Sequence, residues 1–179
     1  MICIGLCLYK ELITIYLPKD VDITYNHNST SGSLNSEVLL INGEIKSTSG
    51  DITLISIEKG AVSSTSGNIE IEESQNIILS STIGDITLGS GSTVSATARS
   101  GNIEINQITN QVNAKTTSGD ITLESLSMNE DSTLEATSGN IKANLEKEVF
   151  IDATTRSGDI DINNKRESRF NHYNHKWGY

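Results

Sequence analysis

The sequence predicts an all-β protein folded as a single-stranded parallel β-helix (β-solenoid) of about eight short coils. Three observations predict it. A Thr-Ser-Gly-Asp/Asn-Ile-x-Leu/Ile signature recurs with glycines 17–20 residues apart. Apolar residues alternate on both sides of each glycine, which is the period of a strand with one buried face. The chain also holds 24 Ile and 42 Ser plus Thr but only 4% aromatic residues. Ile and Thr favour strands, whereas a helical bundle needs far more Ala, Leu, Glu and Lys.

Each repeat contains a Ser-Gly turn, for which the glycine is expected to supply a backbone conformation or close approach that a side chain would forbid. A degenerate earlier copy surrounds Gly32. The predicted structural turn glycines are Gly50, Gly67, Gly84, Gly101, Gly119, Gly139 and Gly158.

The strand that follows each glycine carries an isoleucine two positions after it, and we expect these residues to stack as a core ladder. A second apolar residue follows two positions later on the same face, and it is Leu or Ile in every copy except at Ala143. The predicted ladder is Ile52, Ile69, Ile86, Ile103, Ile121, Ile141 and Ile160.

The strand that precedes each glycine has apolar residues five positions before it, from Ile45 to Ala153, and small residues three positions before it. Each unit is therefore predicted to be strand, Ser-Gly turn, strand and a variable turn. Such short units cannot bury their apolar face alone, so they are expected to stack in register about 4.8 Å apart.

One coil per repeat is favoured over two repeats per coil. The residue after the glycine alternates between Asp and Asn, which suggests a two-repeat unit. The same alternation also avoids the repulsion of Asp stacked directly on Asp, so it fits one repeat per coil. The residues that follow the seven glycines are, in chain order, Asp51, Asn68, Asp85, Asn102, Asp120, Asn140 and Asp159.

The edge opposite the glycines varies in length and is the candidate binding edge. Its largest excursion is 125–133, where Leu126 and Met128 lie beside Glu130 and Asp131. Loops on one edge of a solenoid are frequent binding sites, although a tolerated surface insertion is the alternative.

Domain organisation follows from the repeats. Residues 1–164 form the predicted β-solenoid domain, with 1–30 as lead-in or cap strands and 31–164 as the repeats, while 165–179 form a basic, aromatic C-terminal cap or tail. Cys3 and Cys7 are too far apart in a strand for a disulfide, which needs Cα atoms about 4.4–6.8 Å apart. His172 and His175 have no other ligands close in sequence and are assigned to a solvated tail.

Charge limits the partners. The net charge is −10, divided between −13 for residues 1–164 and +3 for residues 165–179. An acidic body repels phosphate backbones, so no nucleic-acid partner is expected. The apolar run from Ile2 to Leu8 is shorter than the roughly 20 residues of a membrane-spanning helix, so no span is expected in this chain. No signal peptide is recognised.

Two features together resemble a known bacterial family. The stretch from Ile13 to Asp20 resembles the strand that leads into the repeats of an adhesin-like family of unknown function, DUF4097. The Thr-Ser-Gly-Asp-Ile-Thr-Leu segments at 48–54 and 117–123 resemble that family's repeat. The resemblance implies a right-handed β-helix, a cell-surface or envelope location and no catalytic residues to carry over. Without an export signal ahead of this chain, the location is cytoplasmic.

The residues favour a non-enzymatic, adhesin-like binding or scaffold module, with no catalytic residues, cofactor or metal expected. The recurrent aspartates belong to a turn ladder, and Arg99 and Arg156 are expected to bridge neighbouring acidic turns. The expected partner is an unknown protein or glycan. The alternatives are a bactofilin-like polymer, formed by end-to-end self-association of uncapped coils, and a polysaccharide-active β-helix enzyme.

Overall fold

A computed structural model describes residues 23–164 and 171–174, and within these every regular element is a β-strand. The strands are β1 (Thr24–Ser29), β2 (Leu34–Ser49), β3 (Ile52–Ser66), β4 (Ile69–Ile83), β5 (Ile86–Ser100), β6 (Ile103–Ser118), β7 (Ile121–Leu126), β8 (Ser132–Ser138), β9 (Ile141–Leu145), β10 (Ile151–Ser157), β11 (Ile160–Asn164) and β12 (Asn171–Asn174). The predicted lead-in strand and both cysteines lie outside the described residues, as do the tail aromatic and histidine side chains.

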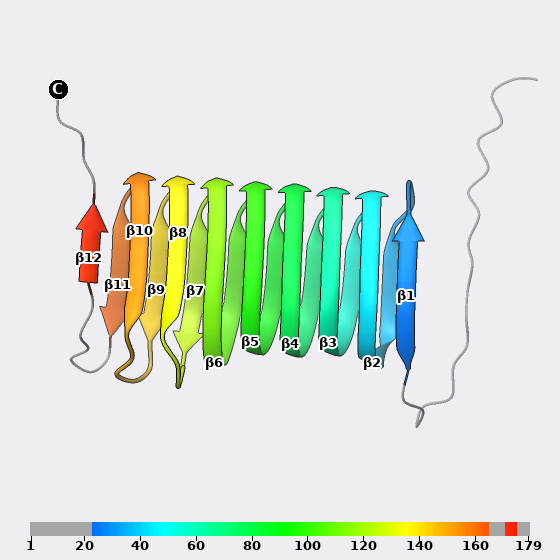
Figure 1. Cartoon of the computed structure of the whole chain (residues 1–179), viewed down its shortest axis with the longest axis horizontal. Coiled ribbons are helices and arrows are strands. Elements are labelled where there is room, and N and C mark those ends of the chain that lie inside the picture. Colours follow the sequence, from blue (N-terminus) through cyan, green and yellow to red (C-terminus); the bar gives the residue numbers. More distant parts are fainter. Residues whose placement is uncertain (1–22, 165–170, 175–179) are drawn as a thin grey trace, which may run out of the picture.

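The strands wind into one parallel β-solenoid, which confirms the predicted fold class. In Figure 1 the nearer half-coils run upward and the fainter, more distant halves run downward, while successive coils proceed from right to left. That combination makes a right-handed coil. We call the half that follows each glycine the descending side and the half that precedes the next glycine the ascending side.

The register assigns one repeat to each coil. Ile52 pairs with Ile69, Ile69 with Ile86 and Ile86 with Ile103, and every neighbouring pair of strands is parallel. The prediction of one repeat per coil is therefore confirmed, and the Asp–Asn alternation runs along the solenoid axis.

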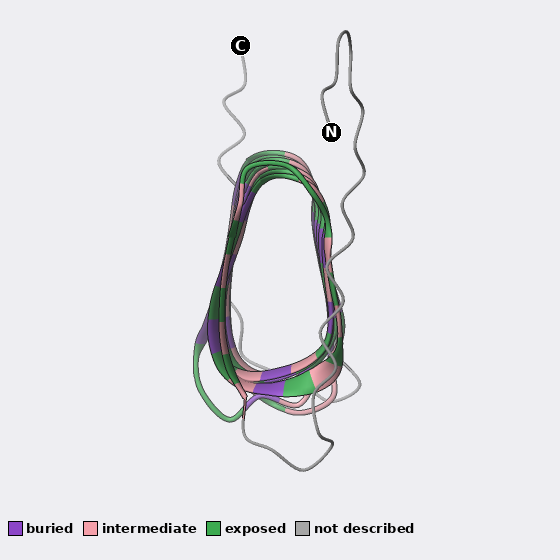
Figure 2. Ribbon diagram, turned by 90° about the vertical axis from the view of Figure 1, so that its right-hand side faces the viewer, coloured by how far each residue is buried: buried purple, intermediate pink, exposed green. Residues whose placement is uncertain are grey.

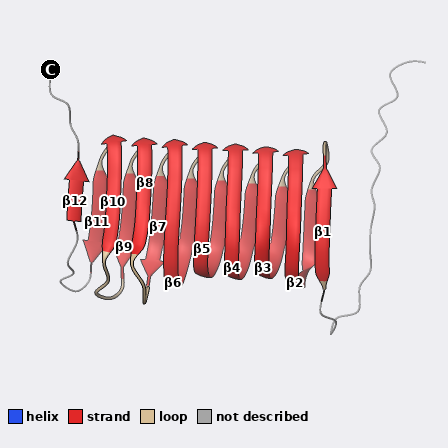
Figure 3. Ribbon diagram, viewed as in Figure 1, coloured by secondary structure: helices blue, strands red, loops and turns tan. Residues whose placement is uncertain are grey.

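Seen along that axis, the coil is flattened, narrow at the glycine turns and broad at the opposite edge (Figure 2). The broad edge differs from the prediction of a variable turn. In β3 to β6 it is continuous strand, because the chain bends there while its backbone stays hydrogen-bonded to the coils on either side. Between β2 and β11, loops interrupt this edge only at 127–131 and 146–150, in the later coils (Figure 3).

The interior is a stack of aliphatic columns. Six isoleucines of the predicted ladder, Ile52 to Ile141, are fully buried, and Ile160 at the C-terminal end is half-buried. The ascending side contributes Ile45, Val62 and Leu79 to the same core. Burying a side chain of this size contributes roughly 1.5–3 kcal/mol, so the stacked columns are the main source of stability.

The backbone of β12 adds one more strand to the ascending side. It pairs in parallel with β10, Asp152 with Asn171 and Thr155 with Asn174. Part of the segment predicted as a C-terminal cap or tail thus continues the sheet.

Candidate functional site

The glycine turns are structural, because each glycine lies against the turn of the preceding coil. Gly119 has a φ of +148°, and a Cβ placed there would lie 2.1 Å from the carbonyl oxygen of Gly101. That separation is far below any non-bonded contact. Both the left-handed backbone and the close approach therefore require glycine.

Beside the glycines, the Asp and Asn side chains form a continuous hydrogen-bond ladder. The backbone N–H of Asn68 donates to Asp51 Oδ1 over 2.8 Å, and the N–H of Asp85 donates to Asn68 Oδ1 over 3.0 Å. Bonds to the carboxylates are slightly shorter than those to the amides, as expected for charge-assisted bonds. The ladder continues through Asn102, Asp120, Asn140 and Asp159. These side chains hold the turns together.

Arg99 and Arg156 do not bridge the acidic turns, so this expectation was wrong. Neither guanidinium has a carboxylate oxygen within 4.0 Å among the residues that the structure describes. Both replace the threonine two positions before a glycine and both are exposed on the ascending side. They are consequently available to a ligand.

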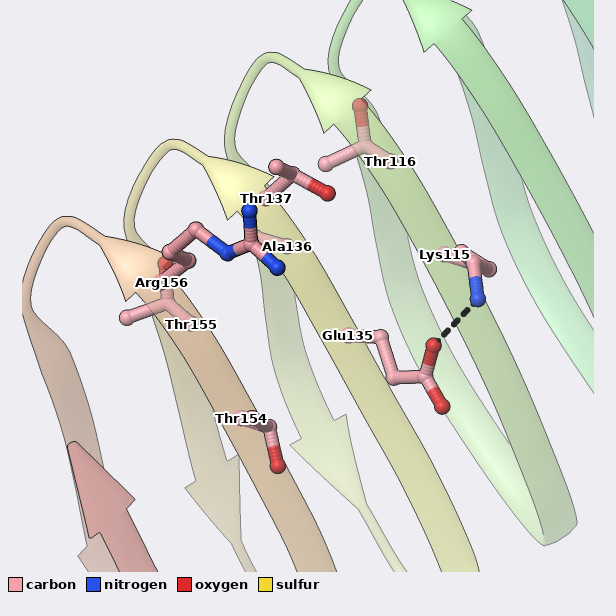
Figure 4. Close-up of a pocket in the computed structure, with 8 residues that line it drawn as sticks. All are labelled: Lys115, Thr116, Glu135, Ala136, Thr137, Thr154, Thr155 and Arg156. Carbon is pink, nitrogen blue, oxygen red and sulfur yellow. Dashed lines mark hydrogen bonds and ion pairs between the residues drawn. The ribbon is translucent and has the colours of Figure 1, made fainter. Parts of the chain in front are cut away.

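Arg156 lines a shallow depression on the ascending side of the last coils (Figure 4). Lys115 of β6 and Glu135 of β8 form an ion pair there, with Nζ and Oε2 2.5 Å apart. The guanidinium of Arg156 points from β10 toward β8, next to the Thr137 hydroxyl (Figure 4). Thr154 completes the outward lining. The depression therefore presents one exposed ion pair, two hydroxyl groups and, among the described residues, one cation without an ion-pair partner.

The predicted binding edge is only partly a surface. Leu126 and Met128 are 0% and 1% exposed, so they belong to the core, while Glu130 and Asp131 are exposed. The register shifts at this bend, so Leu123 and Leu126, three positions apart, both point inward. Only the two acidic residues remain candidates for binding.

The 127–131 loop is tied to the coil before it. Ser127 N donates to Ile108 O over 2.9 Å, and Asn129 Nδ2 donates to Thr109 O over 3.1 Å. At the start of β8, Ser132 Oγ lies 3.1 Å from Met128 Sδ of the loop and accepts a hydrogen bond from Val112 N. The loop is an ordered extension of the core.

The two flat sides differ in charge. Residues 23–163 carry 7 Lys plus Arg and 19 Asp plus Glu, a net charge of −12. The outward positions of the ascending side hold four basic and three acidic residues, a net +1. The turns and the descending side hold ten acidic residues and one lysine, a net −9. The descending acids off the turns are Glu37, Glu70, Glu72, Glu104, Glu124 and Asp161.

Sequence reasoning named Arg99 and Arg156 but missed the Lys115–Glu135 pair. The two residues are 20 positions apart, which is the local repeat length, so a cross-coil comparison of opposite charges would have found them. Among the residues that the structure describes, no group of three or more His, Cys, Asp or Glu side chains is placed to hold a metal ion, and no helix is long and apolar enough to cross a bilayer.

Parallel strands in register from coil to coil, one repeat per coil and a glycine at every narrow turn define the class of protein as a parallel β-solenoid repeat domain. The chain belongs to the Toastrack family, DUF4097, whose profile matches residues 6–178. This family is a domain of unknown function. No curated protein and no solved structure matches the chain.

Proposed function

We propose that this Toastrack domain is a non-enzymatic, adhesin-like binding or scaffold module. The observation that carries the proposal is that the recurrent residues serve the structure of the solenoid, whereas the residues that depart from the repeat lie on its surface. The recurrent carboxylates are engaged in the turn ladder, and Arg156 with the Lys115–Glu135 pair breaks the repeat on an exposed face. A rigid face with local departures from its repeat suits recognition of an extended partner.

The partner is a protein or a glycan of the cell envelope, in line with the family resemblance. The net charge of −12 on residues 23–163 disfavours nucleic acid and long anionic polymers. Hydroxyl groups and an exposed guanidinium on the ascending side suit hydrogen bonding to an uncharged or locally anionic group.

Binding of the full chain to arrays of neutral, acidic and basic glycans, and to immobilised envelope proteins, tests this function. Lys115→Ala with Arg156→Ala should weaken binding on the ascending side. The matched control is Lys46→Ala, since Lys46 is ion-paired to Glu44 on the same side several coils away. Turnover of a polysaccharide, abolished by Asp120→Asn without loss of structure, would overturn the non-enzymatic reading.

The second candidate function is a self-assembling, bactofilin-like polymer. Among the described strands, β11 pairs only with β9 and β12 only with β10, so no described strand covers their outer edges. Ile160 and Ile162 at that end are half-buried and pack on the core. An edge of this kind can pair with a strand of another molecule. Size-exclusion chromatography with light scattering separates the two functions: a concentration-independent monomer rejects the polymer.

A further inference from the structure

A second pocket lies on the outer surface where the descending side passes into the broad edge, across β2 to β5. Its central row is set by cross-strand register: Leu39 pairs with Ser56, Ser56 with Glu73 and Glu73 with Ser90. Ile55, Glu58, Ser74 and Gln75 complete the lining. Small serines lie beside long side chains in this row, which leaves a trough over Ser56.

One wall of the trough is apolar. Leu39 is 47% exposed and Ile55 is 40% exposed. Only five large apolar residues are this exposed in the described part of the chain, and two of them line this one pocket. Exposed aliphatic groups gathered beside polar ones are typical of a contact surface.

The other wall is acidic. Glu58 is half-buried and Glu73 is exposed, and neither carboxylate has a basic group within 4.0 Å among the described residues. Lys59 follows Glu58 directly and forms no ion pair with any described residue. Two uncompensated negative charges therefore face the same trough as the two aliphatic side chains.

The lining also holds an unused polar group. Ser74 is 9% exposed, and its Oγ is buried without a hydrogen-bond partner. At the equivalent position the neighbouring coil has the fully buried Ile57. The Ser74 side chain therefore takes the inward position that Ile57 occupies in the coil before, and the coil after has Gly91 there.

We propose that this pocket binds a lysine or arginine side chain from a basic segment of a partner protein. The aliphatic stem packs on Leu39 and Ile55, and the cationic head lies between Glu58 and Glu73. Long basic side chains combine these two requirements, an apolar stem and a charged head. The proposal rests on the proposed binding function and names a partner class for it. The acidic descending side steers a basic segment toward the pocket.

The test uses the full chain labelled with ¹⁵N and a tetralysine peptide, with a tetranorleucine peptide made soluble by an uncharged tag as the comparison. Tetralysine should shift the amide signals of Ser56, Glu73 and Ser90 saturably. The uncharged peptide should bind with an affinity at least about tenfold lower. Glu58→Gln with Glu73→Gln should weaken tetralysine binding about tenfold. The matched control is Glu70→Gln with Glu104→Gln, which removes two charges from the descending side outside the pocket.

Equal weakening by the two double variants would overturn the pocket, because binding would then follow overall charge alone. Equal binding of the uncharged peptide would overturn the role of the glutamates. Each result leaves the proposed function standing if the chain still binds a glycan or protein through the ascending side. The proposed function fails separately, on catalysis or on polymer formation.

Discussion

The backbone N–H of Asn102 donates to Asp85 Oδ1, 2.7 Å away on the preceding coil. The same bond recurs at each turn from Asp51 to Asp159, so each Asp or Asn side chain fastens the next coil to its own. Asp and Asn alternate in this ladder, and as a result no carboxylate stacks directly on another.

Replacing a ladder residue should therefore loosen the turns. Asp85→Ala removes the acceptor for Asn102 N, and we expect a loss of about 1 kcal/mol in the free energy of unfolding. Asp152→Ala is the control, because Asp152 is exposed outside the ladder. Chemical denaturation followed by circular dichroism measures both. Equal midpoints would show that the ladder contributes nothing.

The glycine turns predict a difference between the first turn and later ones. A Cβ at Gly119 would lie 2.1 Å from Gly101 O, whereas at Gly32 the nearest atom is Ser29 Oγ at 3.7 Å. Both glycines have positive φ. Gly32→Ala should therefore lower the free energy of unfolding only by the cost of an unfavourable backbone conformation, about 1–2 kcal/mol. Gly119→Ala must also displace a neighbouring turn, and we expect a loss of about 3 kcal/mol or more. Thermal melts of the two variants that coincide would contradict the close stacking.

The fold was predictable because its two signals are local and repeated. The alternation of Ile52 and Leu54 identifies an inward face, and a glycine at a fixed distance identifies the turn. Repetition along the chain then leaves stacking as the way to bury those faces. No long-range contact had to be guessed, since each coil repeats the contacts of the last.

The candidate sites were predicted less well, because the alternation of inward and outward side chains is interrupted where the chain bends. At the broad edge the register shifts between Ser36 and Leu39 and again between Leu123 and Leu126. Leu126 and Met128 were named as candidates because they lie in the longest excursion of this edge, and a count of residues does not show which side chains of an excursion turn inward. The trough over Ser56 depends on side-chain lengths in four neighbouring coils, which no single repeat contains.

Two buried hydroxyl groups at equivalent positions should respond oppositely to removal. Thr116 Oγ1 donates to Gly101 O over 3.2 Å, while Ser64 Oγ is buried without a partner. Thr116→Val keeps the shape but loses the bond, at a cost of about 1 kcal/mol. Ser64→Ala removes an unsatisfied group and should be neutral or stabilising. Urea unfolding of both variants checks this, and a larger loss for Ser64→Ala would mean that its hydroxyl is satisfied.

The core column predicts a strong dependence on polarity. Ile121 is fully buried between Ile103 and Ile141. Ile121→Asp places a carboxylate in that column and should prevent stable folding, while Ile121→Val should cost about 1 kcal/mol. Far-ultraviolet circular dichroism and thermal melting distinguish the two. A wild-type melt for Ile121→Asp would refute the stacked column.

The 127–131 loop predicts that its apolar residue matters for stability and its acidic residues do not. Met128 is 1% exposed and lies against Ser132, whereas Glu130 and Asp131 face solvent. Met128→Ala leaves a cavity and should cost about 2–4 kcal/mol, while Met128→Leu, of similar volume, should cost less than about 1.5 kcal/mol. Glu130→Gln with Asp131→Asn should change stability by no more than about 0.5 kcal/mol. Denaturant midpoints of the three variants test this order. If Met128→Ala were as mild as the acidic pair, the loop would be a surface insertion and its methionine would be free to contact a partner.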